Sequence, residues 1–136
     1  MRYLFVVILL LLAGGCKPSQ PTTEAQALRF TTDQEHYASE AEVILRLNNQ
    51  TDETIGYNLC ASELEQRTDQ GWQHVADSTT VCTMIQHGLA PGDSTTYTKT
   101  LMQGLPESIY RFRTSVEYRD TGRQEMIVTD AFSVGT

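Results

Sequence analysis

The chain has 136 residues, a length that fits one domain, and 40% of them are hydrophobic and 20% charged. This balance argues against a disordered polymer and against a protein with several membrane spans. Seventeen acidic residues against ten basic ones give a net charge of −7, which argues against a nucleic-acid-binding protein because that function needs a basic field.

Residues 1–15 have the pattern of an export signal. Met1-Arg2 supplies a basic start, residues 3–13 are apolar, and residues 13–15 are small. The apolar run is too short to cross a bilayer, which takes about 20 residues. A basic start, a short apolar centre and small residues are typical of a signal peptide. The alternatives are a secretory signal without lipid and a buried hydrophobic strand.

Cys16 follows the small residues directly, and this resembles the lipobox of bacterial lipoproteins. Ala13 stands where the box usually has Leu, and Leu12 lies one position further out. The resemblance implies that residues 1–15 are cleaved and that the Cys16 thiol carries a diacylglyceryl group. It also implies a membrane-anchored protein of the cell envelope. Lys17 is not the Asp that resembles an inner-membrane retention signal, so we expect the outer membrane in a cell that has one, and otherwise the outer face of the plasma membrane.

Residues 16–26 form a predicted tether ahead of a domain at 27–136. The segment after the cysteine contains two prolines and no aliphatic side chain larger than alanine, so it cannot bury itself. As a flexible coil it reaches roughly 15–20 Å. That length holds the domain just clear of the lipid headgroups.

From Leu28 onward the apolar pattern has a period of two, which predicts antiparallel strands. The alternation over 42–48 and 110–118 places one set of side chains inward: Val43, Leu45, Leu47, Tyr110, Phe112, Thr114, Val116 and Tyr118. Shorter runs lie at 55–60, 64–67, 72–75, 95–101 and 126–134. Turn sequences separate them, as at 68–71 and 90–93. Together these patterns predict an all-β antiparallel sandwich of seven or eight strands.

Four pieces of sequence, in this order, resemble a bacterial immunoglobulin-like domain: residues 43–49, 64–72, 89–93 and 105–112. The likeness covers most of residues 28–134 and implies an Ig-like β-sandwich. Tyr110 is a candidate for the tyrosine corner of such folds, in which the hydroxyl bonds back to nearby backbone. The same layout is similar to that of a small bacterial proteinase-inhibitor domain.

Cys60 and Cys82 remain when Cys16 is set aside, and an even pair in an oxidising compartment is most simply a disulfide. A bridge around a loop of this length is worth roughly 3 kcal/mol on chain-entropy grounds. We expect it to join a strand end to a loop. The alternatives are a reactive thiol and a metal pair, which no CxxC spacing supports.

The segment 77–89 is the most unusual part of the domain. Its apolar residues Val81, Met84 and Ile85 either pin it to the sandwich beside the disulfide or form a partner-binding edge, and we expect the first. Trp72, the only tryptophan, is expected to cover the core at the end of a hairpin, since aromatic side chains bury a large area. The alternative for Trp72 is an exposed binding platform.

The residue spacing suggests no catalytic or metal site. The three histidines, His36, His74 and His87, lie far apart, no GxSxG sequence frames a serine, and the acidic residues form no calcium loop. We therefore predict no enzyme, cofactor or metal, and the sequence assigns no ligand-binding residue. The expected function is a lipid-anchored, non-catalytic module that binds an envelope protein or polysaccharide. The alternatives are an extracytoplasmic protease inhibitor and an enzyme accessory or small metal-dependent enzyme.

Overall fold

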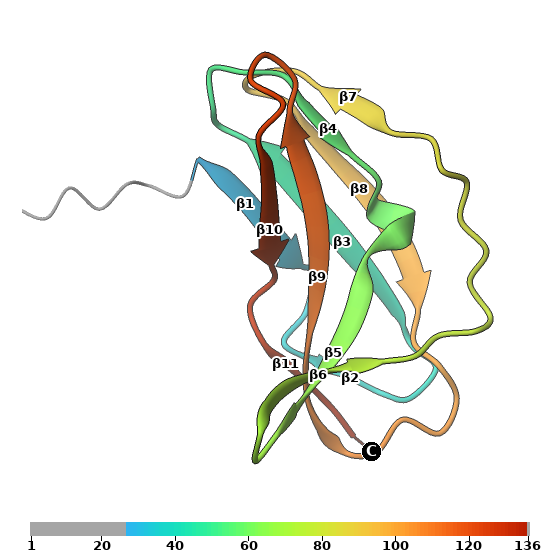
Figure 1. Cartoon of the computed structure of the whole chain (residues 1–136). Helices are drawn as coiled ribbons and strands as arrows, with labels where there is room; N and C mark the ends of the chain where they lie inside the picture. Colours follow the sequence, from blue (N-terminus) through green and yellow to red (C-terminus); the bar gives the residue numbers. More distant parts are fainter. Residues whose placement is uncertain (1–26, 136) are drawn as a thin grey trace, which may run out of the picture.

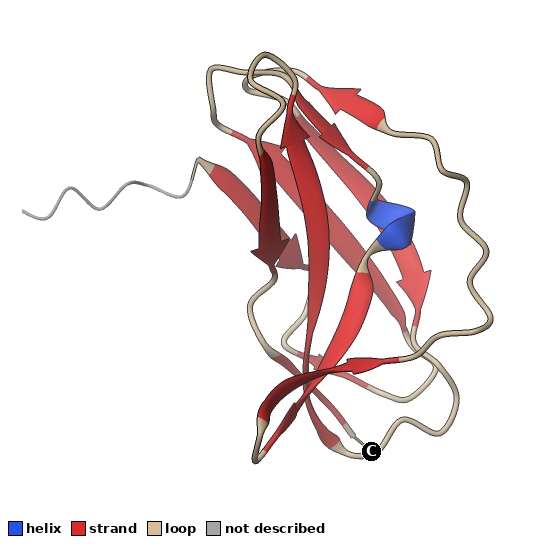
Figure 2. Cartoon of the chain, viewed as in Figure 1, coloured by secondary structure: helices blue, strands red, loops and turns tan. Residues whose placement is uncertain are grey.

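Two β-sheets face each other in the computed structural model, which describes residues 27–135 (Figures 1 and 2). Within these residues the elements are β1 (Leu28–Thr32), β2 (His36–Tyr37), β3 (Glu42–Asn49), β4 (Ile55–Tyr57), the 3₁₀ turn η1 (Leu59–Ala61), β5 (Glu63–Thr68), β6 (Gly71–Val75), β7 (His87–Leu89), β8 (Ser94–Thr100), β9 (Ser108–Tyr118), β10 (Gln124–Val128) and β11 (Phe132–Val134). The predicted all-β sandwich is confirmed. The described strands number eleven rather than seven or eight, because four of them are pieces of only two or three residues.

The smaller sheet has the strand order β1-β3-β8. The central strand β3 buries Val43, Leu45 and Leu47 completely, as the alternation predicts. β8 pairs with β3 along one side only, since no strand in the described residues pairs with its other side. It therefore forms an open edge of the sandwich.

The larger sheet is organised around the eleven-residue strand β9. One half of β9 pairs with β11 and β5, and the other half pairs with β10 and β4. Further out, β2 pairs with β11, β6 pairs with β5, and β7 pairs with β4. The five residues predicted to face inward from β9 are all buried: Tyr110, Phe112, Thr114, Val116 and Tyr118.

An aromatic group closes one end of the core. Phe132 packs edge-on against Tyr37 at 5.2 Å between ring centroids and stacks on Phe112 at 5.7 Å with the ring planes 26° apart. The Tyr110 hydroxyl donates a hydrogen bond to the carbonyl oxygen of Pro106 at 2.7 Å. The tyrosine-corner prediction is thereby confirmed.

The run 126–134 is two strands and not one. After β10 the chain bends at Thr129, whose Oγ1 accepts a hydrogen bond from the Phe112 backbone N–H at 3.0 Å. The Thr129 N–H in turn donates to the Phe112 carbonyl oxygen at 2.9 Å. This exchange with β9 fixes the bend, and the chain re-enters the sheet as β11.

The prediction that Trp72 covers the core is wrong. Val75 pairs with Leu64 and packs against the core, so Trp72, three residues earlier on the same strand, points to the opposite face. There the Arg111 guanidinium lies 4.3 Å from the centre of the indole ring. Trp72 is half-buried on the outer surface of the larger sheet.

The predicted signal peptide 1–15, the tether 16–26 and the lipidation site Cys16 lie outside the described residues. Within the described part, no helix has the length and hydropathy of a membrane span.

Candidate functional site

The segment between β6 and β7, residues 76–86, is here named the Cys82 loop. It runs along the side of the sandwich without regular secondary structure (Figure 1). A disulfide joins Cys82 to Cys60 in η1, with 5.7 Å between the Cα atoms, and this confirms the predicted bridge. The bridge ties the loop to the turn between β4 and β5. In antibody domains the disulfide crosses the core between the two sheets. Here it does not, because it joins a loop to a turn.

Asp77 organises the start of the Cys82 loop. Its carboxylate accepts hydrogen bonds from the Thr79 backbone N–H at 2.8 Å, from the Thr79 hydroxyl at 2.7 Å and from the Thr80 hydroxyl. The Thr80 and Thr79 hydrogen bonds favour the charged form and hold the pKa of Asp77 far below its ordinary value. The turn therefore persists at any pH at which Asp77 is ionised.

Two side-chain contacts fix the end of the loop. Asn58 Nδ2 donates to the Thr83 carbonyl oxygen at 2.8 Å. The Gln86 side chain lies over Gly56 of β4, where a Cβ atom would come within 2.6 Å of Gln86 Cδ. A larger residue at position 56 would make the Gln86 side chain move. The Cys82 loop is thus tied to the rest of the domain by the Cys60–Cys82 disulfide and by the Asn58–Thr83 hydrogen bond.

The apolar side chains of the loop point into solvent. Val81 is 94% exposed, Met84 is 98% exposed and Ile85 is 60% exposed. The expectation that these residues pin the loop to the sandwich is wrong, because polar contacts and the disulfide hold it instead. These side chains are therefore accessible from solvent.

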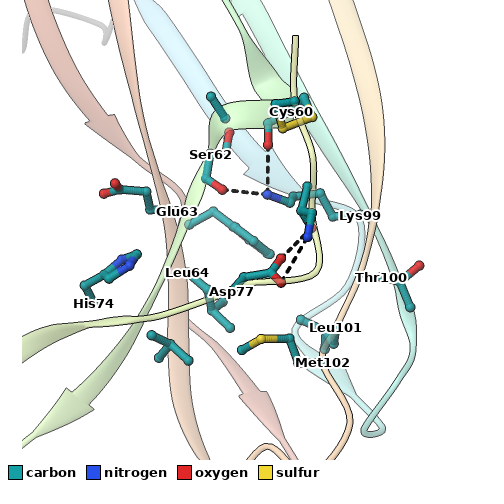
Figure 3. A pocket seen from close by; sticks show the side chains of 15 residues that line it. Cys60, Ser62, Glu63, Leu64, His74, Asp77, Lys99, Thr100, Leu101 and Met102 are labelled. Carbon is teal, nitrogen blue, oxygen red and sulfur yellow. Dashed lines mark hydrogen bonds between the residues drawn. A yellow bond between two sulfur atoms is a disulfide. The ribbon is translucent and has the colours of Figure 1, made fainter. Parts of the chain in front are cut away.

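A pocket of about 290 Å³ lies beneath the loop, between η1 and β5 on one side and the end of β8 on the other (Figure 3). Leu64, Leu101 and Phe112 supply apolar lining, and Lys99 reaches in from β8. Lys99 Nζ donates to the carbonyl oxygens of Cys60 at 2.9 Å and Ser62 at 2.7 Å. The ammonium group therefore links the edge strand to the turn that carries the disulfide.

The surroundings of Lys99 act on its charge in opposite directions. Burial lowers its pKa, and the negative charge of Asp77 opposes this change. Because two carbonyl oxygens of the turn accept hydrogen bonds from the ammonium group, Lys99 holds η1 in place. Its arrangement fits a structural role better than proton transfer.

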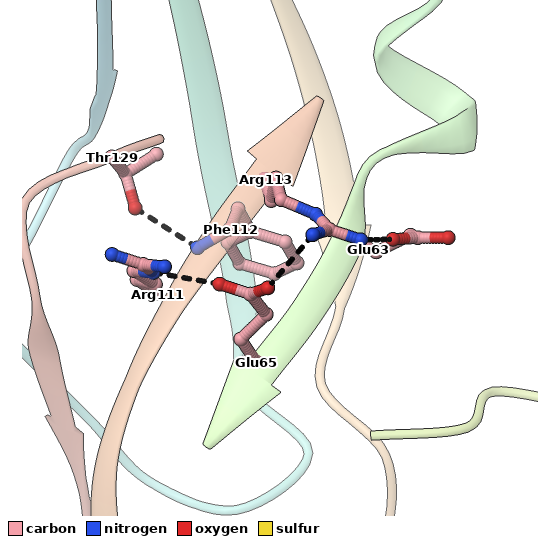
Figure 4. A network of polar contacts seen from close by, with 6 residues as sticks. All are labelled: Glu63, Glu65, Arg111, Phe112, Arg113 and Thr129. Atoms are coloured by element: carbon pink, nitrogen blue, oxygen red, sulfur yellow. Dashed lines mark hydrogen bonds and ion pairs between the residues drawn. The ribbon is translucent and has the colours of Figure 1, made fainter. Parts of the chain in front are cut away.

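The outer face of the larger sheet carries a network of paired charges (Figure 4). Glu65 is only 4% exposed, and its carboxylate meets Arg111 Nε at 2.7 Å and an Arg113 nitrogen at 3.4 Å. Arg113 also pairs with Glu63 at 2.7 Å, and Trp72 covers Arg111. These ion pairs brace β5 against β9, although the buried Arg113 Nε has no hydrogen-bond partner among the described residues.

A second hollow, of about 920 Å³, lies between β1 and β10. On its wall the Arg123 guanidinium lies 3.8 Å from the centre of the Tyr118 ring and 3.1 Å from the Glu125 carboxylate. The Tyr118 hydroxyl donates to the same carboxylate at 2.9 Å. This cluster is again internally paired.

The histidines remain separate in the fold. His36 lies beside Ser133, His74 lies on β6, and the His87 ring is 5.7 Å from the Tyr57 ring. In residues 27–135, no three His, Cys, Asp or Glu side chains come together as metal ligands would. Among residues 27–135, the Cys82 loop carries the two most exposed large apolar side chains, Val81 and Met84.

A two-sheet sandwich with a long central β9, a tyrosine corner and connections at both ends defines an Ig-like domain. Residues 24–131 match the bacterial Ig-like domain family, and the chain therefore belongs to that family. Domains of this kind are generally non-catalytic. The family also suggests an extracellular or envelope location.

Two solved structures are similar in fold. A putative ApaA protein from Bordetella pertussis matches with a TM-score of 0.50 and 14% identity, over 80% of this chain and 88% of that one. A PapD-like domain of human CEP192 matches with a TM-score of 0.43 and 13% identity, over 99% of this chain and 97% of that one. The first shows the sandwich fold alone, and the second is too distant for any inference. No curated protein matches the chain.

Sequence reasoning missed the residues that hold the loop. Asn58 contacts a residue 25 positions away, and the partners of Lys99 are 39 and 37 positions away. Gly56 was the one available signal, because a glycine within a strand often marks a close approach by another group.

Proposed function

We propose that the chain is a lipid-anchored, non-catalytic Ig-like binding module of the bacterial cell envelope, and that the Cys82 loop binds a protein partner. The observation that carries the proposal is the exposure of Val81, Met84 and Ile85 on a loop that a disulfide and a hydrogen bond tie to the turn before β5. Three exposed apolar side chains within one short loop favour an interaction site over a purely structural segment. A loop that is already ordered loses little conformational entropy on binding.

Two further features support an envelope location. The Cys60–Cys82 disulfide fits an oxidising compartment outside the cytosol. The basic start, the apolar run and Cys16 fit an exported lipoprotein. Family membership agrees with both.

The anchor is tested with Cys16→Ser. Cells grown with an alkyne fatty acid should label the unchanged protein, and they should not label the variant. The variant should also leave the membrane fraction or retain its signal. Unchanged labelling and unchanged fractionation would refute the anchor and leave the loop proposal standing.

The binding surface is tested with a photo-crosslinking amino acid placed at position 84 in living cells. Met126 on β10 is a matched control, because it is another methionine, 54% exposed, on a different face. We expect a discrete protein adduct from position 84 and none of the same mass from position 126. No adduct from position 84, or the same adduct from both positions, contradicts the proposal.

A further inference from the structure

We propose that the pocket beneath the Cys82 loop binds a free α-amino acid with an apolar side chain. The carboxylate of the ligand accepts a hydrogen bond from Lys99, and its ammonium group donates one to Asp77. Its side chain lies on Leu64, Leu101 and Phe112. The pocket is separate from the exposed apolar side chains of the loop, so the inference adds a small-molecule site to the proposed protein-binding surface.

The floor of the pocket belongs to the hydrophobic core. Leu64, Leu101 and Phe112 are buried members of the core cluster, and all three line the pocket. A floor made of packed core side chains keeps its shape when no ligand is present. The volume of about 290 Å³ is at the small end of ligand sites, which range from about 300 Å³ upward. The site therefore fits a small ligand with an apolar part.

One wall of the pocket carries a positive charge with unused hydrogen-bonding capacity. The Lys99 ammonium group has three N–H donors, and two of them bind the carbonyl oxygens of Cys60 and Ser62. Within residues 27–135, the hydrogen bonds leave the third N–H without an acceptor. Neither carbonyl oxygen carries a full negative charge. The ammonium group therefore remains available to an anion in the pocket.

The Cys82 loop supplies a negative charge to the same pocket (Figure 3). Asp77 Oδ1 accepts three hydrogen bonds from Thr79 and Thr80, whereas Oδ2 accepts one, from the Thr80 hydroxyl. A carboxylate oxygen has room for roughly two, so Oδ2 retains an acceptor position. The threonine donors are neutral and do not cancel the charge of Asp77.

Lys99 and Asp77 line the same pocket but do not pair directly. They form none of the ion pairs present in residues 27–135, although the Asp77 charge acts on the pKa of Lys99. Glu63, the other carboxylate of the lining, is already paired with Arg113 at 2.7 Å. A free amino acid carries a carboxylate and an ammonium group on one carbon, so it complements both unpaired charges. A simple carboxylic acid or amine complements only one.

The test uses the full-length protein in mild detergent, with its leucine methyl groups labelled with ¹³C. We expect unlabelled L-leucine to shift the methyl signals of Leu64 and Leu101 with a Kd below about 1 mM. Leu28 on β1, at the opposite edge of the smaller sheet, is the control signal and should not shift. Glycine should bind at least roughly 10-fold more weakly, because it has no side chain to bury.

Two derivatives of leucine test the two charges on the unchanged protein. N-acetyl-L-leucine lacks the ammonium group, and L-leucinamide lacks the carboxylate. Each should bind roughly 10-fold more weakly than L-leucine, because a hydrogen bond between charged groups is lost.

Asp77→Asn tests the proposed partner of the ligand's ammonium group. It should weaken L-leucine roughly 10-fold and leave N-acetyl-L-leucine unchanged, since that derivative has no ammonium group to lose. Asp69→Asn in the exposed turn between β5 and β6 is the matched control and should bind like the unchanged protein.

Three results overturn the inference. The first is no saturable shift of Leu64 and Leu101 at about 10 mM L-leucine. The second is equal binding of L-leucine and both derivatives, which makes the pocket a non-selective apolar site. The third is tight binding of L-leucinamide with weak binding of N-acetyl-L-leucine, which points to a peptide amino terminus. The crosslinking at position 84 decides the proposed function separately from all three.

Discussion

The Tyr110 hydroxyl lies 2.7 Å from the carbonyl oxygen of Pro106, four residues earlier in the chain. The ring of Tyr110 is completely buried, so this bond ties the connection between β8 and β9 to the middle of the core. Burial also raises the pKa of the phenol, which keeps the proton needed for the bond at neutral pH.

Tyr110→Phe should lower the free energy of unfolding by about 1 kcal/mol, because it removes this hydrogen bond and leaves the Pro106 oxygen without its donor. Urea denaturation measures the loss. Tyr97→Phe is the matched control at a side chain that is 37% exposed, and it should leave the stability nearly unchanged. Equal effects from the two variants would refute a specific role for the corner.

Replacing both Cys60 and Cys82 with serine should cost roughly 3 kcal/mol of stability, since the bridge restricts the unfolded chain. The melting temperature with and without reductant gives the same comparison on the unchanged protein. Cys16→Ser removes the third cysteine and leaves the bridge intact, so its domain should melt as before. A double variant as stable as the unchanged domain would show that the bridge does not contribute.

Lys99→Met should destabilise the domain by about 1–3 kcal/mol, because the Cys60 and Ser62 carbonyl oxygens lose their donor in a partly buried site. The methionine retains most of the apolar contact, which isolates the hydrogen bonds. Arg46→Met on the exposed side of β3 is the control for loss of one positive charge. If both variants lose the same stability, net charge explains the effect and the bridging role of Lys99 is wrong.

Asp33 makes a pH-dependent contact between the two sheets. Burial alone would raise its pKa, but hydrogen bonds from the Ile44 backbone N–H and the Tyr37 hydroxyl, each 2.8 Å long, bring it below the ordinary value. Burial, together with the Asp33 contact, raises the pKa of Tyr37 to about 12. The pair thus joins β2 to β3 through an ionised carboxylate and a protonated phenol.

Asp33→Asn should therefore reduce the free energy of unfolding at pH 7. It should also make the fall of that free energy at acid pH less steep. A carboxyl group whose pKa is lower in the folded state stabilises the fold above its unfolded pKa, about 3.9, and loses that contribution as the pH falls through the folded pKa. Urea midpoints measured from pH 7 down to pH 2 provide the test. Parallel profiles for the two proteins would contradict the assignment.

The sequence patterns predicted the sandwich because alternation within one strand reports directly on burial. Val43, Leu45 and Leu47 lie on one face of β3 and are fully buried, and the cysteine pair also formed as predicted. The face occupied by Trp72 depends instead on the register of Leu64 with Val75, and local sequence does not determine that pairing.

The orientation of the Cys82 loop was harder to predict for a related reason. The disulfide to Cys60 and the hydrogen bond from Asn58 fix the backbone of the loop, and both partners lie more than 20 residues away in the sequence. With the backbone held there, Met84 and Val81 face solvent although a pocket lies beneath the loop.

Backbone ¹⁵N relaxation across Val81–Ile85 is the most direct test of a fixed binding loop that faces solvent. With the disulfide formed, we predict order parameters near those of the rigid strands, about 0.8 or higher, for Val81, Met84 and Ile85. Asn58→Ala should lower them without unfolding the sandwich. Order parameters below about 0.6 in the unchanged, oxidised domain would contradict a preorganised loop and remove the basis for its binding role.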